Sequence, residues 1–218
     1  MKTQITSKLF LITAALVSAG CTGGGSVYLS QALALGTQCE PGDLGITRGS
    51  LDIGQSSNYF VAFSVASNAV GEQVTIDGRP VNSTSANDFV GEEIVLNYAI
   101  NGTALVPEQL TPATVVIPAG ASIDDSFVGM NLLTAPAVAA LRAQTYPVDV
   151  VVSVFIRGAM RGGGPSSTNT VRFPITITGN TAPVTSCTAP AVLTQGGAPT
   201  CGNPSQDDPS GIATCVAP

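Results

Sequence analysis

The chain of 218 residues contains no histidine and no tryptophan, and its only two lysines, Lys2 and Lys8, stand in the first eight residues. Without histidine or an internal lysine, neither a Ser-His-Asp triad nor a Ser-Lys dyad can be built. Metal and haem sites with histidine ligands are excluded too, and no glycine-rich phosphate loop with its lysine is present. We therefore expect a protein that is not an enzyme and that carries no cofactor.

Positive charge is also scarce, with 8 basic against 14 acidic residues in the whole chain. An acidic chain with no basic run repels phosphate backbones, so nucleic acid is not an expected partner. The same charge disfavours adhesion to anionic lipid headgroups. Any attachment to a membrane must therefore depend on something other than surface charge.

A short hydrophobic segment follows the charged start MKTQITSK. The residues from Leu9 to Ala19 are mostly apolar or small, which together with the preceding lysines is typical of an export signal. The segment is too short to span a membrane, which takes about 20 apolar residues. We interpret residues 1–20 as a signal peptide.

The end of this segment, Val17-Ser18-Ala19-Gly20-Cys21, resembles the bacterial lipobox, in which the cysteine is acylated and becomes the first residue of the mature chain. Serine stands at position 18, where lipoboxes usually carry leucine. No aspartate follows Cys21, so the resemblance to bacterial lipoproteins implies the outer membrane. Residues 21–26 then form a lipid anchor and a flexible tether, and the lipid bilayer is the partner of acylated Cys21. The alternative is cleavage by ordinary signal peptidase, which would release a soluble secreted protein.

Five cysteines are an awkward number for a secreted protein, because one is left without a partner. Acylation of Cys21 leaves four, and we expect these to form two disulfides in an oxidising compartment; they are Cys39, Cys187, Cys201 and Cys215. In each of the three possible connectivities Cys39 pairs with one of the three others, all of which lie after residue 180. Zinc is the alternative, but zinc sites usually combine tighter Cys-x-x-Cys pairs or histidine, so we predict no metal.

The middle of the chain alternates apolar and polar residues in steps of two, which is typical of half-buried β-strands. Five segments show the pattern: NYFVAFSVAS, EIVLNYAING, TPATVVIPAG, YPVDVVVSVFIRG and NTVRFPITITG. Further strands are expected at Val27 to Leu35, Val74 to Val81, Gly49 to Ile53 and Ser126 to Met130. Many short strands separated by turn residues predict an all-β, immunoglobulin-like antiparallel sandwich.

One short helix interrupts the strands, in LLTAPAVAALRAQT, with Thr134 as its N-cap and Pro136 in its first turn. We expect two to three turns that cover one open end of the sandwich. The order of LNYAINGTAL, VVIPAGASIDDSF, this helix and a final hairpin is similar to the water-stress domain of late-embryogenesis-abundant proteins over about residues 58–178. The Asn-Pro-Asn signature of that family is missing. The resemblance implies an immunoglobulin-like sandwich and no particular function.

From Asn180 onward the strand pattern stops, and proline and glycine are dense enough to prevent a regular helix. Three stretches of this tail, SCTAP, TCGNP and TCVAP, repeat a hydroxyl residue, cysteine and proline. The predicted organisation is therefore a signal peptide at 1–20, an anchor and tether at 21–26, a sandwich at 27–179 and an irregular tail at 180–218 that disulfides hold in place.

The loop between the last two strong strands, residues 158–170, is predicted to be a long hairpin tip. It is the candidate binding loop, and its named residues are Arg157, Arg161, Gly162, Gly163 and Gly164. A glycan or a peptide would be its ligand. The alternative is that it only connects two strands.

Carboxylates are the side chains that remain for acid–base chemistry or metal binding. The pairs Glu92-Glu93 and Asp124-Asp125 hold the residue type that glycosidases use, but neighbours on a strand point to opposite faces. Asp207-Asp208 with Asn203 and Gln206 lacks the alternating ligand spacing of an efficient calcium loop. We expect a non-enzymatic lipid-anchored envelope protein with a structural role or with another envelope protein as partner; the alternatives are a glycan- or peptide-binding module and, after it, a carboxylate-dependent hydrolase.

Overall fold

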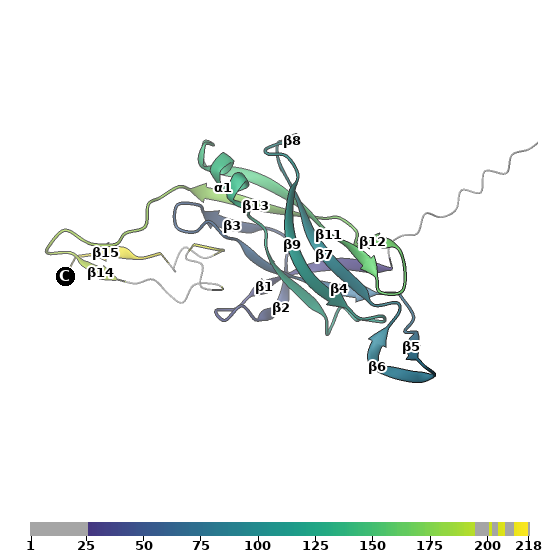
Figure 1. The fold of residues 1–218 in the computed structure, drawn as a ribbon. Coiled ribbons are helices and arrows are strands. Elements are labelled where there is room, and N and C mark those ends of the chain that lie inside the picture. Colours follow the sequence, from purple (N-terminus) through teal and green to yellow (C-terminus); the bar gives the residue numbers. More distant parts are fainter. Residues whose placement is uncertain (1–25, 195–200, 202–204, 208–211, 218) are drawn as a thin grey trace, which may run out of the picture.

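The computed structural model describes residues 26–194, 201, 205–207 and 212–217. Within these ranges the chain forms two facing β-sheets, one short helix and two small hairpins (Figure 1). The smaller sheet has the order β10 (Phe127–Asn131), β4 (Phe60–Ser67), β1 (Val27–Leu35), β2 (Pro41–Ile46). The chain is the all-β sandwich that the alternating pattern predicts.

The larger sheet begins with β3 (Gly49–Asp52), β13 (Val171–Gly179), β11 (Val148–Met160) and β7 (Phe89–Ile100). Both β8 (Thr103–Ala104) and β9 (Gln109–Ile117) pair with β7, and β12 (Pro165–Ser167) pairs with β11. All these neighbours are antiparallel except β3, which runs parallel to β13. The parallel pairing leaves β3 at one edge of the larger sheet.

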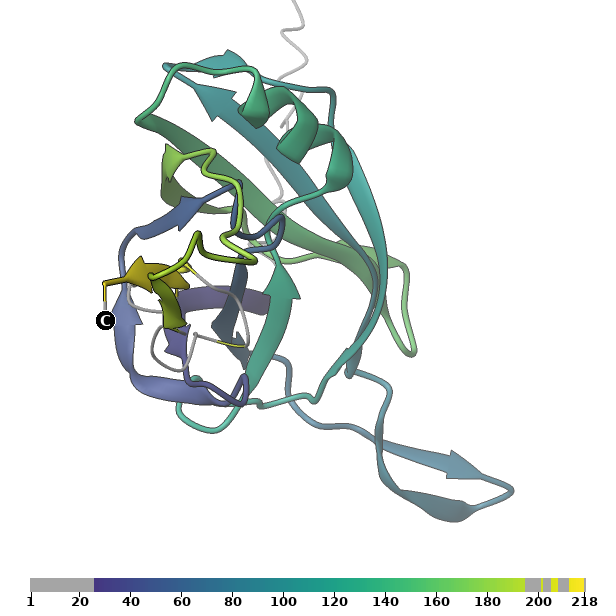
Figure 2. The same ribbon diagram turned by 90° about the vertical axis from the view of Figure 1, so that its left-hand side faces the viewer.

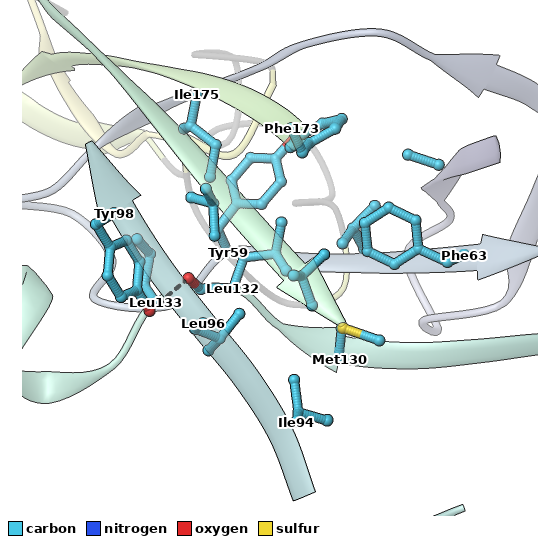
Figure 3. Close-up of a cluster of buried hydrophobic side chains, with 14 of the residues drawn as sticks. Tyr59, Phe63, Ile94, Leu96, Tyr98, Met130, Leu132, Leu133, Phe173 and Ile175 are labelled. Atoms are coloured by element: carbon cyan, nitrogen blue, oxygen red, sulfur yellow. Dashed lines mark hydrogen bonds between the residues drawn. The ribbon is translucent and has the colours of Figure 1, made fainter. Parts of the chain in front are cut away.

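The two sheets enclose a core made by alternate residues of each strand. In β11, Val150, Val152 and Val154 are fully buried, as the period of two predicts. Aromatic rings fill the centre, where Phe63 packs edge-on against Phe173 (Figure 3). Each of these two rings removes a large apolar area from water, and this burial is the main driving force that holds the sheets together.

The buried hydroxyl of Tyr98 ties the core to the segment before the helix. It donates a hydrogen bond to the carbonyl oxygen of Leu132 at 3.0 Å and accepts one from the Thr134 N–H at 3.2 Å (Figure 3). Helix α1 (Ala135–Arg142) starts after Thr134, with a proline in its first turn as predicted. The Thr134 side chain forms no capping hydrogen bond, because Tyr98 holds this turn instead.

Two segments differ from the sequence-based expectation. Residues 74–81, expected as one strand of the sandwich, form the hairpin β5 (Gln73–Ile76) and β6 (Arg79–Ser85), which projects from the sandwich (Figure 2). Its turn is Asp77-Gly78 with φ of 50° and 74°, the Asp-Gly pair that tight hairpin turns favour. The tail is not free of strands either, because β14 (Val192–Thr194) pairs with β15 (Thr214–Val216).

The sandwich has two distinct ends. At one, which we call the entry end, the Asn68 N–H donates to the Ser26 carbonyl oxygen at 2.7 Å, and the Ser26 hydroxyl contacts the Met160 sulfur at 3.6 Å. From there β1 leads toward β2, and the β14–β15 hairpin lies at the opposite end of the molecule (Figure 1). We call this second end the tail end.

Candidate functional site

Three consecutive residues of the tail, Ser205, Gln206 and Asp207, return to the sandwich at its tail end; we call them the tail clip. The Asp52 N–H donates to the Ser205 hydroxyl, which donates in turn to the Asp52 carbonyl oxygen, both at 3.1 Å. The Ser50 N–H donates to the Asp207 carboxylate at 2.8 Å, and the Asp207 N–H donates to the Ser50 carbonyl at 2.9 Å. The tail clip thus satisfies the backbone along the open edge of β3.

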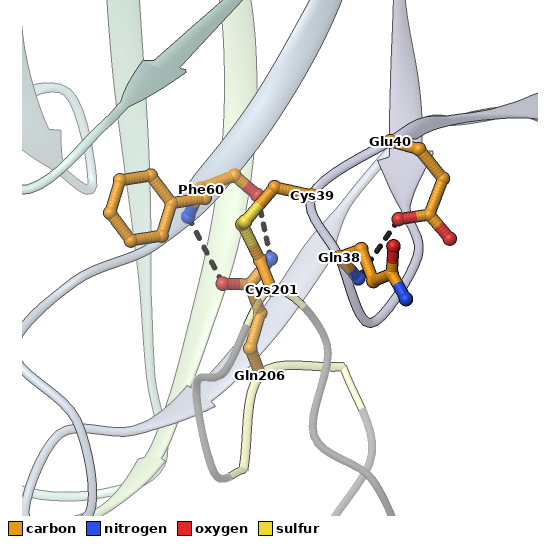
Figure 4. Close-up of a disulfide and its surroundings, with 6 residues drawn as sticks. All are labelled: Gln38, Cys39, Glu40, Phe60, Cys201 and Gln206. Atoms are coloured by element: carbon orange, nitrogen blue, oxygen red, sulfur yellow. Dashed lines mark hydrogen bonds between the residues drawn. A yellow bond between two sulfur atoms is a disulfide. The ribbon is translucent and has the colours of Figure 1, made fainter.

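Gln206 makes the same kind of contact with the smaller sheet. Its side-chain amide nitrogen donates to the Phe60 carbonyl oxygen at 2.6 Å, and its amide oxygen accepts from the Phe60 N–H at 3.0 Å (Figure 4). This side chain imitates the backbone of a neighbouring strand at the start of β4. Because β3 belongs to one sheet and β4 to the other, the tail clip joins the two sheets.

The tail clip is held by the disulfide between Cys39 and Cys201, which are 162 residues apart in sequence (Figure 4). The Cys201 N–H also donates to the carbonyl oxygen of Gly36 at 2.9 Å. Cys187 and Cys215 form the second disulfide, with a separation of 28, beside the β14–β15 hairpin. The structure therefore selects one of the three connectivities that counting allows.

The tail clip also places a carboxylate against the core. The hydroxyl of Tyr59, a fully buried side chain, donates to the carboxylate of Asp207 at 2.9 Å, although Asp207 as a whole residue is exposed. Partial desolvation beside the core raises the pKa of Asp207 above its usual range, and hydrogen bonds from Ser50, Tyr59 and Gln206 oppose the rise. Burial, and next the nearby Asp207 charge, raise the pKa of Tyr59, so this tyrosine stays a neutral donor. Gly49 is required here, because a side chain on it would overlap the Tyr59 ring.

A second feature is on the outer face of the larger sheet. Leu110, Val95 and Phe155 are cross-strand neighbours there, on β9, β7 and β11; we call them the outer stripe. The Arg157 guanidinium lies 5.9 Å from the centroid of the Phe155 ring. It also forms ion pairs with the carboxylates of Glu93 at 3.1 Å and Glu108 at 3.7 Å. An apolar centre with a charged rim is the usual make-up of a protein–protein contact.

The edge of this face is formed by β9, whose described pairing is with β7 alone. Its residues Leu110 and Val116 are 49% and 51% exposed, and Pro112 interrupts its backbone donors, as is common on edge strands. Sequence analysis did not identify this surface. The outer stripe depends on the register between strands that are distant in sequence, and the alternation within each single strand does not report that register.

The candidate binding loop 158–170 is folded more tightly than expected. The Arg161 N–H donates to the Asp88 carbonyl at 2.8 Å, and its guanidinium lies 3.9 Å from the buried Asp88 carboxylate. The Gly162 N–H donates to the Ala86 carbonyl at 2.7 Å, and only a short turn of four residues, 161–164, remains between β11 and β12. Arg157 lies beside the outer stripe instead, over the Phe155 ring, so the two arginines are engaged separately.

The carboxylate pairs lie apart. Glu92 and Glu93 are on β7 of the larger sheet, and Glu93 is paired with Arg157. Asp124, on the loop before β10, lines a separate depression of about 280 Å³ together with Asp43 of the smaller sheet. Within the described ranges, no three side chains of the metal-binding types come together. The Glu pair and the Asp pair therefore do not form one acid–base site.

Some predicted residues lie outside the described residues. These are the signal peptide, Cys21 and its tether up to residue 25, and Asn203 and Asp208 of the calcium alternative. Among the helices that the structure describes, none has the length and apolarity needed to cross a membrane. Comparisons with protein-family models, with curated proteins and with solved structures found no match to this chain.

Removal of the Cys39–Cys201 bridge is expected to destabilise the sandwich more than removal of the Cys187–Cys215 bridge. In the chain-entropy model, the separations of 162 and 28 residues correspond to about 5 and about 3–4 kcal/mol. The double variants Cys39→Ser/Cys201→Ser and Cys187→Ser/Cys215→Ser leave no unpaired thiol from either bridge. Urea unfolding followed by circular dichroism measures both, and a larger loss in the second variant would contradict the role of the tail clip.

Asp207→Asn is expected to change how stability depends on pH. Because the folded state raises the pKa of Asp207, the folded protein binds this proton more tightly than the unfolded chain, whose pKa is about 3.9. The wild type therefore loses stability relative to the variant as pH rises from about 3.9 through the folded pKa, and the difference is constant above it. Urea unfolding of both proteins across the acid range measures this.

Asp149→Asn is the control for this experiment. A hydrogen bond from Thr176 lowers the pKa of Asp149, so the wild type should gain stability relative to this variant as pH rises toward about 3.9. Slopes of the same sign for the two variants would contradict the assignment at Asp207.

Proposed function

We propose that the protein is a non-enzymatic, lipid-anchored component of the outer membrane that acts by binding another envelope protein. The two disulfides indicate an extracytoplasmic protein. Their pairing uses four of the five cysteines and leaves Cys21 outside the bridges. That residue follows the export signal, where acylation of lipoproteins takes place. The export signal, the cysteine count and the two bridges together support the anchor.

The observation that carries the binding role is the outer stripe. Within it Leu110 is exposed, Phe155 is half-buried and Val95 is fully buried, and the charges at its rim are already paired, so a partner would meet little unpaired charge on this face. The open edge of β9 adds backbone groups that a partner strand can use. By contrast, Arg161, the arginine of the loop 158–170, is engaged by Asp88. The glycan- or peptide-binding alternative therefore has less support than a protein partner.

Cys21→Ser is expected to move the protein from the membrane fraction to the soluble fraction of the envelope, because the lipid that holds it in the membrane is lost. Cys39→Ser is the control, since it removes a cysteine without touching the anchor and should stay with the membrane. Intact-mass spectrometry of the wild type should give a mature chain that begins at Cys21 and carries acyl groups. A mature chain that begins at unmodified Cys21 would contradict the anchor.

A photo-crosslinking residue at Leu110 or Val116 is expected to capture one discrete partner in the native envelope, identified by mass spectrometry. The control position is Leu44, which is 77% exposed but lies on the smaller sheet. Adducts from the two β9 positions and none from position 44 would support the outer stripe as the interface. Equal capture from all three positions, or none from β9, would contradict it.

A further inference from the structure

We propose that the β5–β6 hairpin is a membrane contact, whose apolar tip rests on the bilayer that holds the lipid of Cys21. The inference rests on the proposed lipid anchor and adds to it the orientation of the sandwich. In this orientation the entry end faces the membrane and the tail end points away from it. The partner of the hairpin is the lipid surface itself.

Ser26, the first described residue, and the base of the hairpin lie at the same end of the sandwich. Ser26 is bonded to Asn68 at 2.7 Å, two residues before Val70. The Val70 carbonyl accepts a hydrogen bond from the Asn87 side chain at 2.7 Å, and residues 70 and 87 flank the hairpin. The base of the hairpin and the start of the described chain are therefore close neighbours.

The length of the tether limits how far the sandwich can lie from the membrane. Five residues separate the Cys21 anchor from the sandwich, and they span at most about 18 Å when fully extended. The four residues of β5 project the tip by about 13 Å. The hairpin, which leaves the sandwich beside Ser26, is thus shorter than the longest reach of the tether, so its tip can contact the bilayer that holds Cys21.

The hairpin exposes apolar side chains at its tip and at its base. Ile76 at the tip is 62% exposed and Val70 at the base is 80% exposed. Asp77 and Arg79 place opposite charges beside Ile76, and Arg79 is the only basic residue in the sequence from 70 to 87. An exposed aliphatic tip of this kind binds the apolar part of the bilayer surface rather than anionic headgroups. It also supplies a second weak attachment beside the lipid, which stabilises anchoring.

The tail end also exposes apolar residues, but the tether does not bring them to the membrane. Val192 of β14 is 59% exposed. The nine residues of β1 that lead away from the entry end span about 30 Å, well beyond the tether. The β14–β15 hairpin lies at the far side of the sandwich (Figure 1). Its exposed residues provide a matched control for the tip.

Single tryptophan variants test the orientation, because the chain has no tryptophan of its own. The mature chain is coupled through the Cys21 thiol to a maleimide lipid in phosphatidylcholine vesicles that contain brominated acyl chains. We expect the fluorescence of Ile76→Trp to fall by roughly half, as for a residue at the headgroup boundary. The fluorescence of Val192→Trp should stay at its value in unbrominated vesicles. Inclusion of anionic lipid should leave both results unchanged.

Quenching at position 192 alone, equal quenching at both positions, or quenching at neither would overturn the proposed orientation. Quenching at position 76 that appears only with anionic lipid would overturn the apolar contact. The chemical coupling makes this outcome independent of acylation in cells. An unmodified Cys21 in the native envelope would therefore refute the anchor and not this result, so the two failures remain distinguishable.

Discussion

The fold depends on backbone groups of β3 and β4 that the sandwich cannot satisfy by itself. Ser50 and Asp52 are on the outer edge of the larger sheet, and Phe60 begins a strand of the other sheet. Buried amides without partners cost several kilocalories per mole each. The tail clip supplies these partners, and the Cys39–Cys201 bridge keeps it in place. Three residues of the tail, Ser205, Gln206 and Asp207, therefore complete the edge of the sandwich.

The alternating pattern in the sequence predicted most of the sandwich, because burial on one face of each strand requires a period of two. It did not predict the β5–β6 hairpin: Val74 and Ile76 alternate like core residues, and the Asp77-Gly78 turn that follows them was the overlooked signal. Cysteine counting predicted the bridge from Cys39 to the tail but not which tail cysteine takes it. The roles of Ser205 and Gln206 had no signal, since their partners are backbone groups 146 to 153 residues away.

The candidate site, like the fold, has features that composition predicts and features that depend on long-range pairing. The absence of histidine and of internal lysine restricts the chemistry from composition alone. The outer stripe required the register of three strands, and the engagement of Arg161 required the position of Asp88. Local sequence thus reports which residue types are present, while long-range pairing decides which of them are free to meet a partner. For this chain the second kind of information moves attention from the loop 158–170 to the face formed by β7, β9 and β11.

The position of the tail clip at the end of the chain has a consequence for biogenesis. An exported chain leaves its translocon from the N-terminus, so every strand of the sandwich emerges before Cys201 does. During that interval Cys39 has no native partner, and the edge of β3 is open to pairing with other chains. Docking of the segment that carries Cys201 and the tail clip is therefore the closing step of maturation, and a chain truncated before Cys201 would be exported with the strands of its sandwich present but its sheet edge unprotected.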